Sequence, residues 1–140
     1  PTLLHHRTMM LEQISDDSRF LVGKVSQNQY NREIKNSKIT LSPFGWGEVC
    51  FRDFEAVLNG SLLVKPDMSH LETWPDIFIP GETYVPIEWD GSDLVEKIDF
   101  FLNNESALRK VVQNAFENYH EQIKTIDDRM DSILNLIEEY

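Results

Sequence analysis

A glycine-containing turn leads into a run of charged residues at helical spacing. The Gly-Trp-Gly turn at residues 45–47 precedes Glu48, and Glu48, Arg52 and Glu55 stand at i, i+4 and i+7, which places them on one face of a helix. Glycine lets a ligand approach the backbone closely, and the amides of a helix N-terminus attract phosphate. A glutamate here can accept hydrogen bonds from both hydroxyls of a ribose. The alternative is a solvated face on which Arg52 bridges the two carboxylates.

A second set of polar residues follows the next strand-like run. Lys65 ends that run, and Asp67, Ser69 and His70 lie in the loop after it. Lysine can neutralise a diphosphate as a point charge, and His70 or Ser69 can donate to a phosphate or a sugar hydroxyl. Because ligands of open α/β sheets bind at the carboxyl ends of the strands, we expect this set to meet the residue 45–55 set there. The alternative is a surface loop in which Asp67 and Ser69 cap a turn.

The aromatic residues and the single cysteine have simpler interpretations. Trp46 and Trp74 can form a stacking wall for a base or sugar, but packing is the commoner role of aromatics near Pro and Gly. Cys50 falls in the apolar pattern of the predicted helix, which favours a buried small hydrophobe over a nucleophile. One cysteine and four histidines lack the spacing of zinc ligands, so no metal site is expected.

Composition excludes several classes of protein. The chain has 140 residues, with 13 basic and 24 acidic side chains and a net charge of −11, so nucleic acid is an improbable partner. No apolar run approaches the ~20 residues of a membrane span. A lone cysteine fits a reducing compartment, and we expect a cytoplasmic protein. The size predicts one domain over residues 1–140. The chain begins at Pro1, which suggests an excised or processed piece.

Apolar periodicity and turn residues predict alternating helices and strands. Helices are expected at about 4–16, 26–36, 48–59, 94–102 and 105–120, and strands at about 20–25, 39–41, 61–65 and 83–88. Strands separated by helices predict a mainly parallel sheet covered on both faces, a Rossmann-like three-layer α/β domain. Because doubly wound domains usually have five or six strands, one at the N-terminal edge is either missing or supplied from elsewhere.

The C-terminal segment carries a short heptad pattern. Ile123, Ile126, Met130, Ile133 and Ile137 follow 3-4-3-4 spacing, which predicts a terminal helix over about 121–138. Packing across its own domain is the favoured interpretation. Homodimerisation or docking to another domain remains open.

Several runs together resemble the C-terminal, donor-binding half of GT-B glycosyltransferases of group 1 type, with the spore-maturation and exostosin-like subgroup as the nearest pattern. The runs are SPFGWGE at 42–48, RDFEA at 52–56, LVKPDMSHLETWPD at 63–76, PGETYVP at 80–86 and WDGSDL at 89–94. The likeness extends from about residue 42 to 102. It implies that the chain binds a nucleoside-diphosphate sugar whose glycosyl group passes to an acceptor hydroxyl.

The resemblance also assigns roles to residues. It implies that Glu55 contacts the donor ribose, that Glu48 is the partner glutamate, and that the loop from Asp67 to Leu71 contacts phosphate. It implies no bound metal and no cofactor beyond the donor, and no counterpart here of the acceptor-binding half, so the chain alone should transfer little. The candidate substrate-binding residues are Gly45, Trp46, Gly47, Glu48, Arg52, Glu55, Lys65, Asp67, Ser69 and His70. No catalytic residue is assigned.

Two rival functions remain. One is a non-catalytic α/β interaction module that docks through its C-terminal heptad helix. The other is a different nucleotide-using enzyme of GT-B architecture, such as an epimerase.

Overall fold

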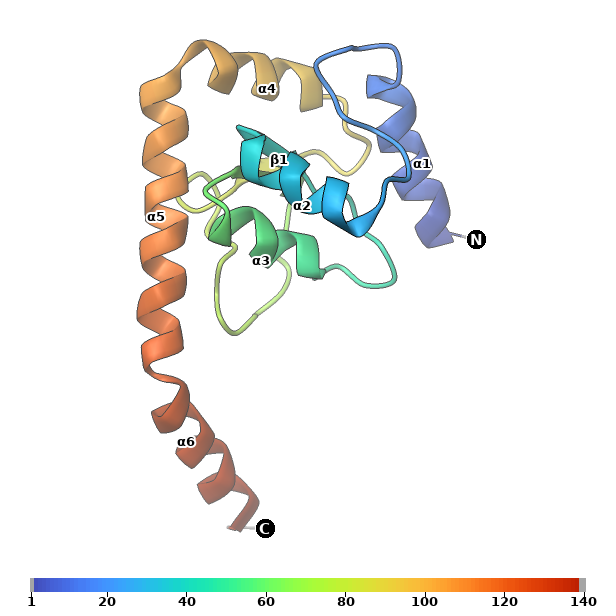
Figure 1. Cartoon of the computed structure of the whole chain (residues 1–140). Coiled ribbons are helices and arrows are strands. Elements are labelled where there is room, and N and C mark those ends of the chain that lie inside the picture. The colour runs from blue at the N-terminus through green and yellow to red at the C-terminus, as the bar shows by residue number, and fades with distance from the viewer. Residues whose placement is uncertain (1, 139–140) are drawn as a thin grey trace.

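Three parallel strands in the order β1-β2-β3 form the centre of the computed structural model, which describes residues 2–138 of the chain (Figure 1). The elements in chain order are α1 (Thr2–Ile14), α2 (Gln27–Asn36), β1 (Ile39–Leu41), α3 (Phe51–Leu58), β2 (Leu62–Pro66), β3 (Val85–Ile87), α4 (Leu94–Asn103), α5 (Glu105–Lys124) and α6 (Ile126–Glu138). Thr40 lies opposite Leu63, and Val64 lies opposite Val85.

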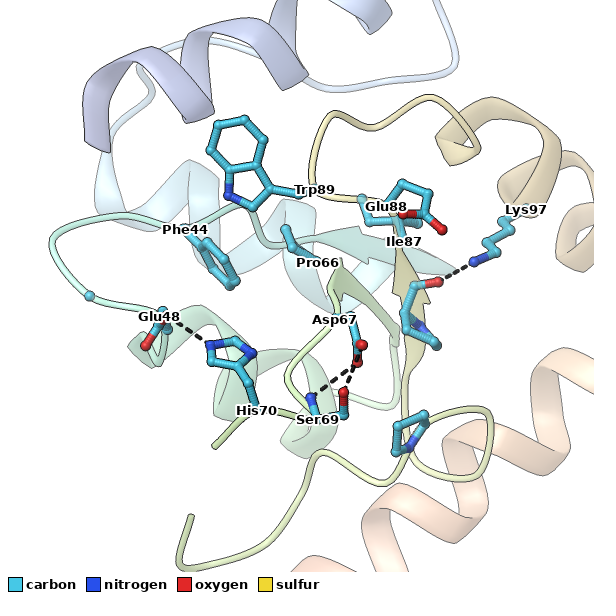
Figure 2. A pocket seen from close by; sticks show the side chains of 13 residues that line it. Phe44, Glu48, Pro66, Asp67, Ser69, His70, Ile87, Glu88, Trp89 and Lys97 are labelled. Carbon is cyan, nitrogen blue, oxygen red and sulfur yellow. Dashed lines mark hydrogen bonds and ion pairs between the residues drawn. The ribbon is translucent and has the colours of Figure 1, made fainter. Parts of the chain in front are cut away.

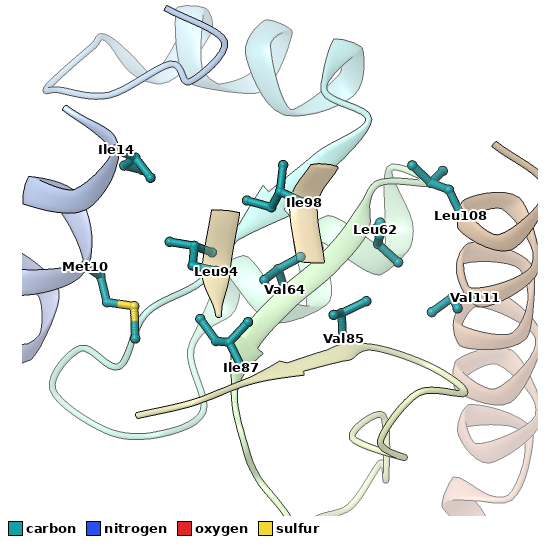
Figure 3. Packing of buried hydrophobic residues seen from close by; sticks show 10 residues of the cluster. All are labelled: Met10, Ile14, Leu62, Val64, Val85, Ile87, Leu94, Ile98, Leu108 and Val111. Atoms are coloured by element: carbon teal, nitrogen blue, oxygen red, sulfur yellow. The ribbon is translucent and has the colours of Figure 1, made fainter. Parts of the chain in front are cut away.

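The central strand β2 divides the interior into two cores. Leu62 and Val64 point into the first core, which α1, α4 and α5 cover (Figure 3). Leu63 points into the second core, beneath α3. Every residue of β2 is buried, as expected for a strand with a covered face on each side. The expected Rossmann-like three-layer α/β fold with a mainly parallel sheet and a helical C-terminus is therefore confirmed.

Local sequence explains where several elements begin. Ser26 caps α2, because its side chain accepts a hydrogen bond from the amide of Gln29. Asn104 separates α4 from α5 and caps α5 by accepting from the amide of Ala107. The predicted helices near 4–16, 26–36, 94–102 and 105–120 and the strands at 39–41, 61–65 and 83–88 are all present, with small shifts at their ends.

The predicted strand at residues 20–25 is wrong. This segment has no regular structure, and Leu21, Val22 and Val25 are exposed. Gly23 takes a positive φ of 116°, which interrupts an extended conformation. The part of the chain that the structure describes consequently has three paired strands, not four. The β-favouring side chains are present, but no neighbouring strand pairs with them.

The helix predicted from residue 48 begins later, at Phe51. Cys50 is its N-cap, and the Asp53 carboxylate accepts a 2.9 Å hydrogen bond from the Cys50 backbone N–H. Cys50 is therefore a half-buried cap and not the buried helix residue that its spacing predicted. Glu48 lies before the helix, so the predicted shared face of Glu48, Arg52 and Glu55 does not exist.

The single terminal helix predicted over 121–138 is two elements. Helix α5 ends at Lys124, Thr125 is its C-cap, and α6 begins at Ile126 (Figure 1). The favoured interpretation, that the heptad residues pack across the domain, is wrong for α6. The side chains of Ile126, Met130, Ile133 and Ile137 are 41% to 66% exposed.

Candidate functional site

A cleft of about 760 Å³ opens at the carboxyl ends of β2 and β3, beside the loop that follows β1 (Figure 2). Ligands of parallel α/β sheets bind at this edge. The lining residues are Phe44, Gly47, Glu48, Pro66, Asp67, Ser69, His70, Pro80, Pro86, Ile87, Glu88, Trp89 and Lys97. Of the sequence-predicted set, the cleft brings together Gly47, Glu48, Asp67, Ser69 and His70; it is not lined by Gly45, Trp46, Arg52, Glu55 or Lys65.

Glu48 and His70 form a polar pair across the cleft. His70 Nε2 lies 2.9 Å from Glu48 Oε1, which joins the loop after β1 to the loop after β2 (Figure 2). Both side chains remain about half exposed. A carboxylate and an imidazole in this position can exchange their mutual hydrogen bond for bonds to ligand hydroxyls.

Asp67 is held by the loop that it begins. Its carboxylate accepts hydrogen bonds from the Ser69 backbone N–H at 3.1 Å, from Ser69 Oγ at 2.7 Å and from Tyr84 OH at 3.2 Å. The hydrogen bonds from Ser69 lower the pKa of Asp67 below 3.8, with a smaller contribution from Tyr84. Burial raises the pKa of Tyr84 to about 12. Asp67 is thus an ionised acceptor in a fixed orientation, within the turn that sequence reasoning offered as the alternative.

Lys65 does not reach the cleft. Its side chain has no exposed surface, and Nζ lies 3.2 Å from Asp53 Oδ2 and over the ring of Phe44. The alternation of β2 explains this, because Lys65 points to the same face as Leu63, beneath α3. Asp53 also accepts a 2.5 Å hydrogen bond from Ser42 Oγ. This buried network ties the ends of β1 and β2 to the start of α3, and so fixes the loop that carries Gly47 and Glu48.

Arg52 and Glu55 do not line the cleft. Glu55 Oε2 accepts a 2.6 Å hydrogen bond from Tyr30 OH of α2. Burial, and then this hydrogen bond, raise the pKa of Tyr30 to about 12. Arg52 lines a separate cavity beside α2 and β1. A ligand that touches both Glu55 and the cleft would have to extend beyond the residues that line the cleft.

The aromatic wall of the cleft differs from the predicted one. Trp46 is fully exposed, whereas Phe44 and Trp89 line the cleft. His6 of α1 supports both, with ring centroids 5.2 Å from Phe44 and 4.8 Å from Trp89. His6 Nε2 lies 2.9 Å from the Trp89 carbonyl oxygen, and because a carbonyl only accepts, Nε2 carries the hydrogen. Burial lowers the pKa of His6, so the ring is neutral.

Sequence reasoning also missed Glu88 and Lys97. Lys97 Nζ donates to the Pro86 carbonyl at 2.5 Å and lies 2.6 Å from Asp93, so its charge is already partnered at the rim of the cleft. For Glu88 the available signal was its sequence position. Residues directly after one buried parallel strand lie at the same edge of the sheet as residues directly after the neighbouring strand. Trp89 and Glu88 follow β3 as Asp67 follows β2.

Within residues 2–138, no group of three or more His, Cys, Asp or Glu side chains could hold a metal ion. Nor is any helix of that part of the chain long and apolar enough to cross a membrane.

Comparison with known proteins supports the fold and gives a family. The fold is similar to the crystal structure of the C-terminal domain of a glycosyl transferase group 1 family protein (LpcC) from Francisella tularensis, with a TM-score of 0.57 and 14% sequence identity. The match covers 88% of this chain and 65% of that one, so the chain spans less than two thirds of that domain. No curated protein is significantly similar in sequence. The profile of the family described as "Glycosyl transferase-like" matches residues 11–135. The chain therefore belongs to the glycosyl transferase-like family.

Proposed function

We propose that this domain binds a nucleoside-diphosphate sugar, the glycosyl donor of a GT-B transferase of group 1 type. The observation that carries the proposal is the cleft at the carboxyl ends of parallel strands, which presents Glu48, His70 and Asp67 in a member of a glycosyltransferase-like family. Carboxylates and imidazole suit sugar hydroxyls, because each oxygen or nitrogen can accept from one of them. The subgroup, spore-maturation and exostosin-like, remains part of the proposal.

The donor would lie across the residue 43–47 loop. The sugar would occupy the cleft, with Glu48 and His70 on its hydroxyls and Ser69 beside Asp67. The ribose would lie beside Glu55. The Glu55 carboxylate is able to accept from a hydroxyl, since it accepts a 2.6 Å hydrogen bond from Tyr30 OH. The diphosphate between the sugar and the ribose would meet backbone amides of the loop. Lys65, which is buried, would act by fixing that loop and not by contact.

The reaction itself would need groups that these residues do not supply. In glycosyl transfer the bond from the anomeric carbon to the diphosphate breaks, and a bond from that carbon to the acceptor oxygen forms. We propose that an acceptor-binding domain outside these 140 residues holds the acceptor glycan or other hydroxyl compound and the group that takes its proton. As in the GT-B enzymes that it resembles, the donor would need no metal and no other cofactor. A cytoplasmic location fits the lone Cys50.

Calorimetric titration of the chain with UDP, GDP, ADP and their sugar conjugates tests the proposal. One nucleotide sugar should bind, with equal affinity in EDTA and in magnesium. Glu55→Gln removes a charge-assisted hydrogen bond worth about 1.5–3 kcal/mol, so it should weaken binding about tenfold or more. Glu96→Gln on α4 is the matched control, since Glu96 is exposed and does not line the cleft. Unchanged affinity in Glu55→Gln removes Glu55 from the site, and no binding by a folded chain contradicts the proposal.

One observation favours a second function. The apolar residues of α6 are exposed, and α6 contacts the rest of the domain mainly through α5. A non-catalytic module that docks or dimerises through α6 would show self-association without nucleotide binding.

Product analysis with the full-length protein would separate a transferase from an epimerase of the same architecture.

A further inference from the structure

The turn at residues 45–47 holds a fully exposed tryptophan at the rim of the cleft. Phe44 and Glu48, on either side of this turn, line the cleft, and so does Gly47 (Figure 2). Trp46 lies between them in sequence, yet its side chain is 100% exposed and does not line the cleft. Single exposed aromatic residues are common on protein surfaces, so exposure alone gives Trp46 no role. The residues beside it add the argument.

The two glycines that flank Trp46 are not needed for the conformation that the structure shows. Neither Gly45 nor Gly47 has a positive φ. A Cβ atom on Gly45 would meet no atom within 4 Å, and one on Gly47 would lie 3.8 Å from the Val49 carbonyl oxygen, an ordinary contact. Alanine would therefore fit at both positions. Because glycine reaches backbone conformations that other residues rarely adopt, the pair gives the turn access to a second conformation.

The segment of residues 45–49 is fixed at its ends and loosely held between them. Buried Phe44 precedes the segment, and Cys50, the N-cap of α3, follows it. In the described part of the chain, the segment forms one hydrogen bond with residues outside it, the 2.9 Å contact between Glu48 and His70. Both of these side chains are about half exposed. The turn can therefore change conformation between two fixed ends at the cost of a single exposed hydrogen bond.

We infer that the 45–47 turn is a lid, which rotates about Gly45 and Gly47 when the glycosyl donor binds and lays the indole of Trp46 over the sugar. The inference rests on the proposed function, which puts that sugar in the cleft. Phe44 and Trp89 already line the cleft with aromatic rings. A sugar ring presents apolar C–H groups on its faces, and a flat indole can cover them without competing for the hydroxyl groups. Closure would also exclude water from the ligand.

Calorimetric titration with UDP-glucose, UDP-N-acetylglucosamine, GDP-mannose and ADP-glucose tests the inference on the parent chain and three variants. Trp46→Ala removes the indole, whereas Gly45→Ala/Gly47→Ala keeps it and restricts the turn. Phe51→Ala is the matched control, because Phe51 is also an exposed aromatic residue, at 87%, and does not line the cleft. The double-alanine variant should not lower the midpoint of urea unfolding, since alanine fits the observed conformation at both positions.

The donor that binds the parent chain should bind Trp46→Ala and the double-alanine variant about tenfold or more weakly. Phe51→Ala should bind it with the affinity of the parent chain. Parental affinity in either Trp46→Ala or the double-alanine variant overturns the inference and leaves the proposed function standing. No binding by the folded parent chain contradicts the proposed function and overturns the lid with it, so the parent chain distinguishes the two failures.

Fluorine NMR separates a lid from a residue that only shapes the turn. The chain has three tryptophans, so labelling with 5-fluorotryptophan gives three resonances, and Trp46→Phe identifies that of residue 46 by its loss. Without ligand, this resonance should show the full shift between H₂O and D₂O that an exposed indole gives. Saturation with the donor should remove most of that solvent shift. A Trp46 resonance that keeps its full solvent shift at saturation overturns the inference.

Discussion

The polar side chains at and near the cleft divide into those that can meet a ligand and those that cannot. Asp67 and His70 keep exposed acceptors, whereas Lys65 and Asp53 are fully buried and satisfy one another. Burying a charge is costly unless it is paired. The Lys65–Asp53 pair therefore matters for the shape of the 43–49 loop and not for contact with a phosphate.

Replacing Lys65 by Met should be strongly destabilising. It leaves the Asp53 carboxylate buried without its cation, which costs about 3–5 kcal/mol. The double variant Lys65→Met/Asp53→Asn keeps polar groups for Ser42 and Cys50 and should regain much of that loss. Urea unfolding followed by near-UV circular dichroism measures both. Arg109→Met breaks an exposed pair with Glu105 and should leave the midpoint nearly unchanged. Additive losses in the double variant would contradict a coupled pair.

His6 should make stability depend on pH near neutrality. Burial lowers the pKa of His6 below its ordinary 6.5, so the unfolded chain binds the proton more readily. Stability from the neutral ring is present above pH 6.5 and is lost as the pH falls through 6.5 toward the folded pKa. His6→Gln keeps a donor for the Trp89 carbonyl but does not titrate. The difference in unfolding free energy between the two chains should change between pH 8 and pH 5.5; parallel curves would show that His6 titrates equally in both states.

At the scale of elements, the sequence predicted the helices and strands that a local residue pattern determines. It missed the features that depend on contact with another part of the chain. Residues 39–41, 61–65 and 83–88 carry their own β-favouring sequence and also find partners, so they form strands. Residues 20–25 have a similar sequence without a partner and remain irregular. The start of α3 could not be read from apolar spacing, because the Asp53 side chain sets it by accepting from the Cys50 amide. The cleft was predicted in part for the same reason. Residues after each strand were expected together, but Lys97 and the supporting His6 depend on how α4 and α1 pack.

Helix α6 should be dispensable for the α/β core. It contacts mainly α5 and buries none of its heptad residues. A chain that ends after Thr125 should therefore lose helical signal but keep the unfolding midpoint measured from near-UV tryptophan signals. Light scattering after size-exclusion chromatography should show that any self-association of the whole chain disappears in the truncated one. A fall of several degrees in the midpoint would mean that α6 stabilises the domain directly.

At the scale of the whole molecule, charge should decide how an anionic donor approaches. The chain carries a net charge of −11, and the cleft is lined by Glu48, Asp67 and Glu88, while the amine of Lys97 is already paired with Asp93. A nucleoside-diphosphate sugar that enters this cleft meets repulsion that salt screens, because the Debye length falls from about 30 Å at 0.01 M to about 8 Å at 0.15 M. Affinity for the nucleotide sugar should therefore rise with added salt.

Titrations at ~0.02 M and ~0.2 M NaCl measure this dependence, with a neutral methyl glycoside of the same sugar as the control. The glycoside should bind equally at both salt concentrations, because it has no charge to screen. Affinity for the nucleotide sugar that falls steeply with salt would contradict the assignment, since that is the behaviour of phosphates held by exposed cations. It would move the diphosphate toward Arg7 and Arg52, which line the separate cavity beside α2 and β1.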